Sequence, residues 1–112
     1  MKVMLYVVLD HVAETEQLLR DLSKKGYNGT VIPTTGLHHV LPKFSDGSGA
    51  ISLAMMVDDL PEGNITLFMI MDEETVEAVK RDIREATHDF TYVKGGMFVL
   101  PLLSWEGSFE SK

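Results

Sequence analysis

The sequence predicts an α+β domain with the ferredoxin-like order βαββαβ and an extended loop or hairpin between strands 2 and 3. Apolar, β-favouring runs alternate along the 112 residues with two segments whose apolar positions recur at helical spacing. A further strand-like run, residues 48–57, lies in the long connection 36–64. If it is counted as part of that connection, the remaining order is that of a split βαβ arrangement. The length, with no visible linker or repeat, favours one domain over residues 1–112.

The first part of the chain supplies a strand, a helix and a strand. The run KVMLYVVL (2–9) is almost entirely apolar and predicts a buried strand. Asp10 is a candidate N-cap for a helix over about 12–25, whose apolar positions share one face: Val12, Leu18, Leu19 and Leu22. The run GTVIPTT (29–35) predicts a second strand, in which Pro33 indicates an edge or a bulge.

A long connection, residues 36–64, separates this part from the rest of the chain. It contains Gly, Pro and two adjacent histidines, followed by a strand-like run, SGAISLAMMV (48–57), and a turn. We interpret 48–57 as a hairpin elaboration within the connection. Long irregular connections in compact domains are often functional, and binding residues concentrate on loops that a rigid scaffold holds.

The second part repeats the pattern of strand, helix and strand. The run ITLFMIM (65–71) predicts a buried strand, and Asp72 is the candidate N-cap of a helix over about 73–87. A loop (88–96) and a last strand, MFVLPLL (97–103), follow, and the polar tail beyond them is expected to be partly loose. The apolar stripe of this helix is Val76, Val79 and Ile83.

Three of the predicted strands, 2–9, 65–71 and 97–103, are apolar on both faces. Strands of this kind are normally buried on both sides. Two helices can cover only one face of the sheet, and a bare apolar face would exceed the patch that a monomer tolerates. The pattern therefore predicts self-association.

Composition excludes several classes of function. The net charge of −7 argues against nucleic-acid binding, which needs a basic surface. The chain has no Cys, so it offers no disulfide, thiolate metal site or Cys nucleophile. The first residues lack the pattern of a secretory signal, and no apolar run is long enough to span a bilayer, so we expect a cytoplasmic protein.

Three stretches of the sequence resemble PII-type signal-transduction proteins, especially the PII-like branch that contains the cyclic-di-AMP receptors. TTG (34–36) ends the second strand, and NITLFMIMDEETVEAV (64–79) joins a strand to an acidic helix start. GGMFVLP (95–101) closes the domain, with Phe109 shortly after it. With the opening strand and helix, the resemblance covers nearly the whole chain.

The resemblance implies a non-enzymatic regulatory homotrimer with its sheets facing inward. It also implies a small effector, usually an adenine nucleotide, bound in the cleft between neighbouring subunits. The family builds that cleft from the loops corresponding to residues 36–64 and 88–96 here. Loop 36–64 is then the segment expected to contact a target protein, and no cofactor is expected.

The chain departs from the family at the ligand loops. The cyclic-di-AMP receptors have a short first loop and a long second loop, and these proportions are reversed here. Leu37-His38-His39 stands where those proteins continue with a Gly-Gly-Phe-like sequence. The long-known PII proteins carry a modifiable Tyr, which this loop lacks, and a Gly-Asp-Gly-Lys phosphate cradle, whose nearest equivalent is Lys94-Gly95-Gly96. The resemblance therefore supports the fold of the family more strongly than its ligand.

The candidate ligand-binding residues form two groups. In Lys94-Gly95-Gly96 the glycines would allow close approach of the backbone to a phosphate, and the lysine would add a positive charge. The alternative is a glycine turn before a strand, with the lysine in solvent. Thr34, Thr35 and Gly36 could donate hydroxyl and amide hydrogens to a base or ribose; alternatively, the two hydroxyls bond their own backbone.

Two other classes of function are open alternatives: a small ferredoxin-like enzyme, and a metal-handling or adaptor trimer. Adjacent His38 and His39 point to opposite sides of an extended chain, so a metal site would need copies from several subunits. The acidic pairs and triplets fall in a turn (58–59) and at a helix start (72–74), where such residues are common. The sequence has no P-loop, HExxH or nucleophile triad, so we expect no catalytic site and no resident metal.

Overall fold

The computed structural model describes residues 1–37 and 63–109. These residues form the strands and helices in the order β1 (Lys2–Asp10), α1 (Ala13–Lys24), β2 (Thr30–Thr34), β3 (Asn64–Asp72), α4 (Glu73–Thr87) and β4 (Gly95–Pro101). The four strands make one antiparallel sheet in the order β2-β3-β1-β4. The predicted ferredoxin-like α+β fold is confirmed, and most of the connection 36–64, including the proposed hairpin 48–57, lies outside the described residues.

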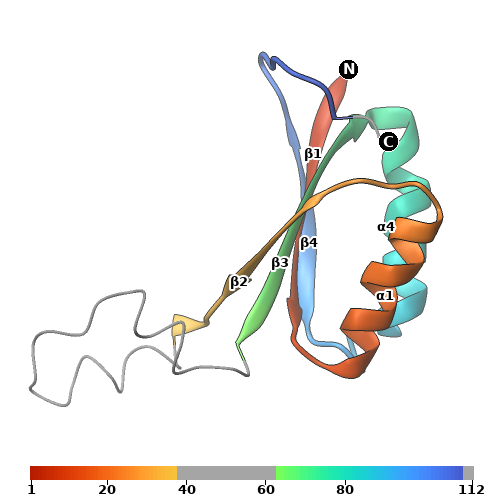
Figure 1. The fold of residues 1–112 in the computed structure, drawn as a ribbon, viewed down its shortest axis with the longest axis vertical. Coiled ribbons are helices and arrows are strands. Elements are labelled where there is room, and N and C mark those ends of the chain that lie inside the picture. The colour runs from red at the N-terminus through yellow and green to blue at the C-terminus, as the bar shows by residue number, and fades with distance from the viewer. Residues whose placement is uncertain (38–62, 110–112) are drawn as a thin grey trace, which may run out of the picture.

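Both helices lie on the same side of the sheet (Figure 1). Alternate residues of β1 and β3 point to that side and pack against the apolar stripes of the helices, which forms the core. The buried apolar residues of this core are Val3, Leu5, Val7, Leu9, Leu18, Leu22, Leu67, Met69, Met71, Val76, Val79, Ile83 and Val93. No helix within the described ranges is both long and apolar enough to span a membrane.

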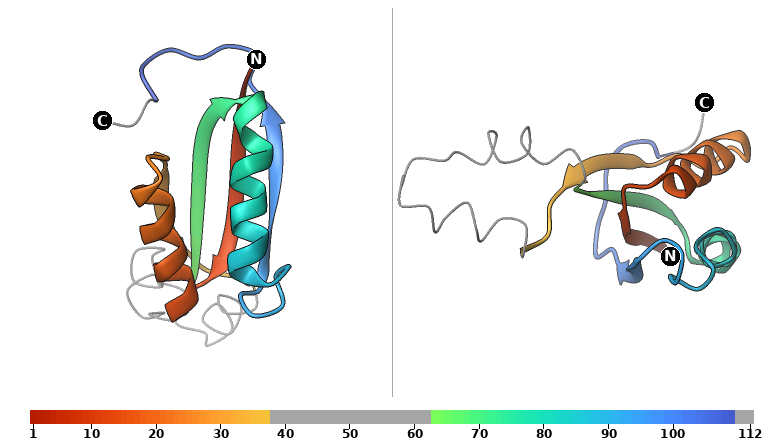
Figure 2. Two further views of the ribbon diagram at one scale, coloured as in Figure 1. Left: turned by 90° about the vertical axis from the view of Figure 1, so that its right-hand side faces the viewer. Right: turned by 90° about the horizontal axis from the view of Figure 1, so that it is seen from below.

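The opposite face of the sheet is also apolar, as the sequence predicts. Pairing places Tyr6 of β1 between Phe68 of β3 and Phe98 of β4, and the rings of Tyr6 and Phe98 stack at 4.9 Å. Phe98 is 49% exposed. The apolar residues on this open face are Met4, Tyr6, Val8, Ile32, Phe68, Ile70, Phe98 and Leu100. The helices leave this face uncovered (Figure 2).

The tail that the sequence predicted to be partly loose contacts the rest of the domain as far as Phe109, and residues 110–112 lie outside the described residues. Trp105 lies over the ammonium group of Lys2, 5.3 Å from the ring centroid, and packs edge-on against Phe109 at 6.0 Å. Phe109 lines a small hollow together with Phe68 and Ile70. The segment therefore runs across the end of the sheet where β1 begins, because aromatic and cation–π contacts hold it there.

The start of α1 differs from the prediction, whereas the start of α4 agrees with it in position. The N-cap of α1 is Val12 rather than Asp10, because β1 continues through Asp10, whose amide donates to the carbonyl of Lys94 at 2.9 Å. Asp72 does occupy the N-cap of α4, but its carboxylate makes no capping bond. It lies instead 3.3 Å from the ammonium of Lys2.

The last strand also begins and ends two residues earlier than predicted. It covers Gly95–Pro101 rather than 97–103, because Gly95 and Gly96 pair with Leu9 and Val8 of β1. The loop after α4 is correspondingly shorter and ends at Lys94. Pro33 lies in β2, at one edge of the sheet, where its missing N–H disrupts no internal pairing.

Candidate functional site

One end of the sheet gathers both groups of candidate ligand residues. Thr34 at the end of β2 pairs with Asn64 at the start of β3, and Asn64 pairs with Asp10 at the end of β1. Gly95 opens β4 opposite Leu9 of β1. The connections 35–63 and 88–94 therefore both meet the sheet at this end, which we call the loop end.

The two groups lie at opposite edges of the loop end. Strands β2 and β4 are the outer strands, with β3 and β1 between them. Three interstrand spacings separate the outer strands by about 14 Å. Thr34 and Gly95 of one chain therefore cannot contact the same phosphate group. The structure brings the groups to one end but does not join them within a subunit.

The threonine group combines one hydroxyl that has a partner with one that has none among residues 1–37 and 63–109. Thr34 Oγ1 lies 2.8 Å from Thr66 Oγ1 on the neighbouring strand. Among the described residues, the Thr34 hydroxyl therefore has a side-chain partner on β3, which is neither the ligand contact nor the bond to its own backbone that the sequence suggested. Thr35 Oγ1 is buried without a hydrogen-bond partner in the part of the chain that the structure describes. A buried hydroxyl without a partner carries a free-energy cost, which an incoming acceptor or donor would remove.

Gly95 has a role in the packing of the strands. Its φ of +148° is unfavourable for residues with side chains, and a Cβ there would stand 1.8 Å from the carbonyl oxygen of Val8. The absence of a side chain at Gly95 is therefore required by the approach of β4 to β1, whether or not a ligand binds.

Gly96 differs from its neighbour. A Cβ at Gly96 would meet no atom within 4 Å. Gly96 pairs with Val8, so it belongs to the open face of the sheet. No described residue fills the space of its missing side chain, which leaves room next to Lys94. Lys94 itself is exposed.

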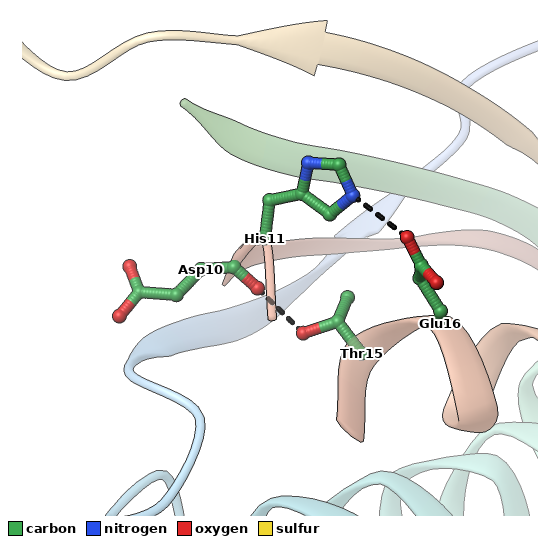
Figure 3. A network of polar contacts seen from close by, with 4 residues as sticks. All are labelled: Asp10, His11, Thr15 and Glu16. Carbon is green, nitrogen blue, oxygen red and sulfur yellow. Dashed lines mark hydrogen bonds and ion pairs between the residues drawn. The ribbon is translucent and has the colours of Figure 1, made fainter. Parts of the chain in front are cut away.

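A polar cluster at the loop end was missed by the sequence interpretation. Nε2 of His11 lies 3.1 Å from Oε1 of Glu16, and the hydroxyl of Thr15 donates to the carbonyl of Asp10 (Figure 3). His11 and Glu16 are both exposed. The available signal was a histidine directly before a helix with acidic residues in its first turn. The cluster holds the start of α1 against the end of β1.

The structure offers no metal centre among residues 1–37 and 63–109, where no group of three His, Asp or Glu side chains converges. His38, His39, Asp58 and Asp59 lie outside the described residues. The acidic residues 72–74 lie at the start of α4, at the end of the sheet opposite the loop end. They are therefore separate from both groups of candidate ligand residues.

Comparisons with known proteins support the fold. No family model matches the sequence, and no curated protein is similar to it in sequence. The structure is similar to that of a functionally unknown protein from Pediococcus pentosaceus, with a TM-score of 0.61 and 18% identity, covering 96% of this chain and 99% of that one. It is also similar to Arabidopsis thaliana PII bound to citrate, with a TM-score of 0.58 and 17% identity, covering 90% and 74%. At these identities the likeness shows the fold alone, which is PII-like.

Proposed function

We propose that this protein is a non-enzymatic, PII-like regulator that binds a small phosphorylated effector, an adenine nucleotide, between the subunits of a homotrimer. One observation carries the proposal: the two groups of candidate ligand residues lie at the same end of the sheet but at opposite edges. If the subunits assemble side by side around their open faces, the β2 edge of one subunit approaches the β4 edge of the next. The two groups then line one cleft.

The open apolar face supports the assembly. Its aromatic and aliphatic side chains, Phe98 among them at 49% exposure, need a cover that the helices do not supply. Packing against two further copies of the chain would remove these apolar side chains from water. Three chains of 12.5 kDa give a particle of about 37.5 kDa.

Within such a cleft, each candidate residue has a distinct role. Lys94 supplies the positive charge, and the amide of Gly95, which points away from β1, supplies a donor to phosphate oxygens. Gly96 leaves room for the ligand, since its own amide faces Val8 of β1. Thr34, Thr35 and Gly36 of the neighbouring subunit contact the base or ribose. The buried hydroxyl of Thr35 supports this role: it has no partner in the described part of the chain, and a ligand atom would give it one.

Signalling to a target protein is assigned to loop 36–64. This part of the proposal rests on the sequence, because residues 38–62 lie outside the described ranges. We expect hydrogen exchange of residues 37–47 to slow when effector or target binds. Exchange in 37–47 of the free protein as slow as in β3 would contradict the switch role.

A thermal-shift panel tests the effector. The purified protein is heated with ATP, ADP, AMP, cyclic-di-AMP or citrate; citrate is included because the similar Arabidopsis protein is bound to it. A ligand at a hundred times its Kd stabilises the folded state by about 2.7 kcal/mol, which a melting curve resolves. A shift with a nucleotide supports the proposal. No shift with any nucleotide in a folded trimer contradicts it.

A further inference from the structure

The loop that leads to Lys94 begins with an unusual turn. Three consecutive residues, His88, Asp89 and Phe90, have φ values of 52°, 55° and 62°. None is glycine, and this left-handed conformation is disfavoured for residues with a Cβ. Such a run persists only where the surrounding structure holds it in place, and it is typical of functional sites.

Thr87 holds this turn. Its side chain is completely buried, and its hydroxyl donates to the carbonyl of Ile83 at 2.8 Å and accepts from the amide of Phe90 at 3.1 Å. Its carbonyl accepts from the amides of Thr91 and Tyr92, at 3.2 and 3.1 Å. One residue therefore binds three successive amides of the loop and ties them to the last turn of α4.

The far end of the loop is fixed as well. Val93 is 1% exposed and belongs to the core. The carbonyl of Lys94 accepts from the amide of Asp10, and Gly95 packs directly against Val8. Between the two ends, the rings of His88 and Tyr92 stack at 3.9 Å. The segment 88–94 is therefore a braced connection whose shape depends on Thr87 at one end and on β1 at the other.

We propose that Thr87 is a positioning residue, which sets the direction in which Lys94 and the amide of Gly95 face an anionic ligand. This inference rests on the proposed function, because it names the residue that fixes the shape of the loop at the proposed ligand site. A preorganised loop loses little conformational freedom when it binds, so its affinity depends on the contacts that hold it. Thr87 touches no ligand in this scheme.

Three variants of the full chain separate positioning from general stability. Thr87→Val keeps the shape of the side chain but removes the acceptor of the Phe90 amide. Thr87→Ser restores the hydroxyl. Val76→Ala is the matched control: it weakens the core in the first turns of the same helix, at the end away from the loop. Each variant is compared with the wild type at a temperature where all four proteins are folded.

Two readouts are measured: amide hydrogen exchange of residues 90–96, and the Kd for the nucleotide that shifts the wild-type melting temperature most. In Thr87→Val the loop amides should exchange about tenfold faster and the Kd should rise about tenfold, as expected for the loss of about one buried hydrogen bond. Thr87→Ser should resemble the wild type. Val76→Ala should lower the melting temperature and leave both readouts unchanged.

Failure of this inference is distinct from failure of the proposed function. If the wild type binds no nucleotide, the proposed function fails, and the exchange of residues 90–96 alone decides whether Thr87 sets the loop. Unchanged loop exchange in Thr87→Val overturns the positioning role. Faster exchange with an unchanged Kd also overturns it, because the ligand would then not depend on the loop geometry.

Discussion

Gly95 lies so close to Val8 that a Cβ at Gly95 would stand 1.8 Å from the Val8 carbonyl oxygen. This contact lets β4 pair with β1 from its first residue. It also divides the Gly95-Gly96 pair into a glycine that the fold requires and one that it does not. The first two predictions use this difference.

Gly95→Ala is expected to destabilise the fold. The backbone at φ +148° is unfavourable for alanine, by about 1–3 kcal/mol, and the overlap with Val8 adds to this. A loss of about 3 kcal/mol would lower the melting temperature by more than about 10 °C in a domain of this size. Calorimetry measures it, and a melting temperature within about 3 °C of wild type would show that β4 can move away from Val8.

Gly96→Ala is expected to leave the melting temperature of the free protein nearly unchanged, because its Cβ meets no atom within 4 Å. Gly96→Val adds more bulk at the same place and should weaken effector binding or assembly. Titration calorimetry and light scattering separate these two effects. Wild-type affinity in a Gly96→Val trimer would remove Gly96 from the proposed cleft.

Lys94→Ala should weaken nucleotide binding by roughly ten- to a hundredfold, the effect of losing one charge-assisted contact of about 1.5–3 kcal/mol. The net charge of −7 sharpens this expectation, because the protein as a whole repels anions and affinity must come from local contacts. Lys24→Ala is the matched control, since it removes the same charge at the end of α1 away from the loop end. Equal affinities of the two variants in folded trimers would reject Lys94 as the phosphate contact.

If the protein forms the proposed trimer, Phe98→Glu is expected to convert it to a folded monomer. The side chain of Phe98 lies on the open face, stacked on Tyr6 and 49% exposed, so a carboxylate is tolerated there in a free subunit but not against another apolar face. Light scattering should give about 12.5 kDa instead of about 37.5 kDa. Phe98→Leu keeps the face apolar and should remain a trimer. A wild-type protein that is already monomeric at micromolar concentration would contradict both the assembly and the cleft.

The pair of Lys25 and Asp82 joins the end of α1 to α4 at 3.0 Å. The hydrogen bond to Asp82 raises the pKa of Lys25 above its ordinary value. A raised lysine pKa contributes stability below the unfolded-state value of about 10.4, and that contribution disappears as pH rises through the folded-state value. The melting temperatures of wild type and Lys25→Gln should therefore differ slightly at pH 8 and converge as the pH rises through the raised pKa of Lys25. The difference should be small, because the Lys25 side chain is 53% exposed and solvent screens its interaction with Asp82.

The sequence by itself determined the type and order of the described elements. Local patterns decide these features: the stripe Val76, Val79 and Ile83 predicts α4, and the apolar runs of β1 and β3 predict central strands. The apolar character of the second sheet face was also predictable, because residues of both parities in β1 are apolar. Pro33 indicated an edge or a bulge, and β2 is an edge strand.

Only the tertiary structure decided where the candidate residues lie relative to one another. The strand order places Thr34 and Gly95 at opposite edges, and strand order depends on contacts between residues far apart in the chain. Because β4 pairs with β1, β4 begins at Gly95 rather than at residue 97. The bond from the Asp10 amide to the Lys94 carbonyl likewise keeps Asp10 in β1, so it does not cap the helix. The left-handed turn after Thr87 has no local sequence signal, since glycine is absent from it and buried hydrogen bonds hold it. Local preferences are worth a few tenths of a kcal/mol to about 1 kcal/mol per residue, so long-range pairing and burial override them at these positions.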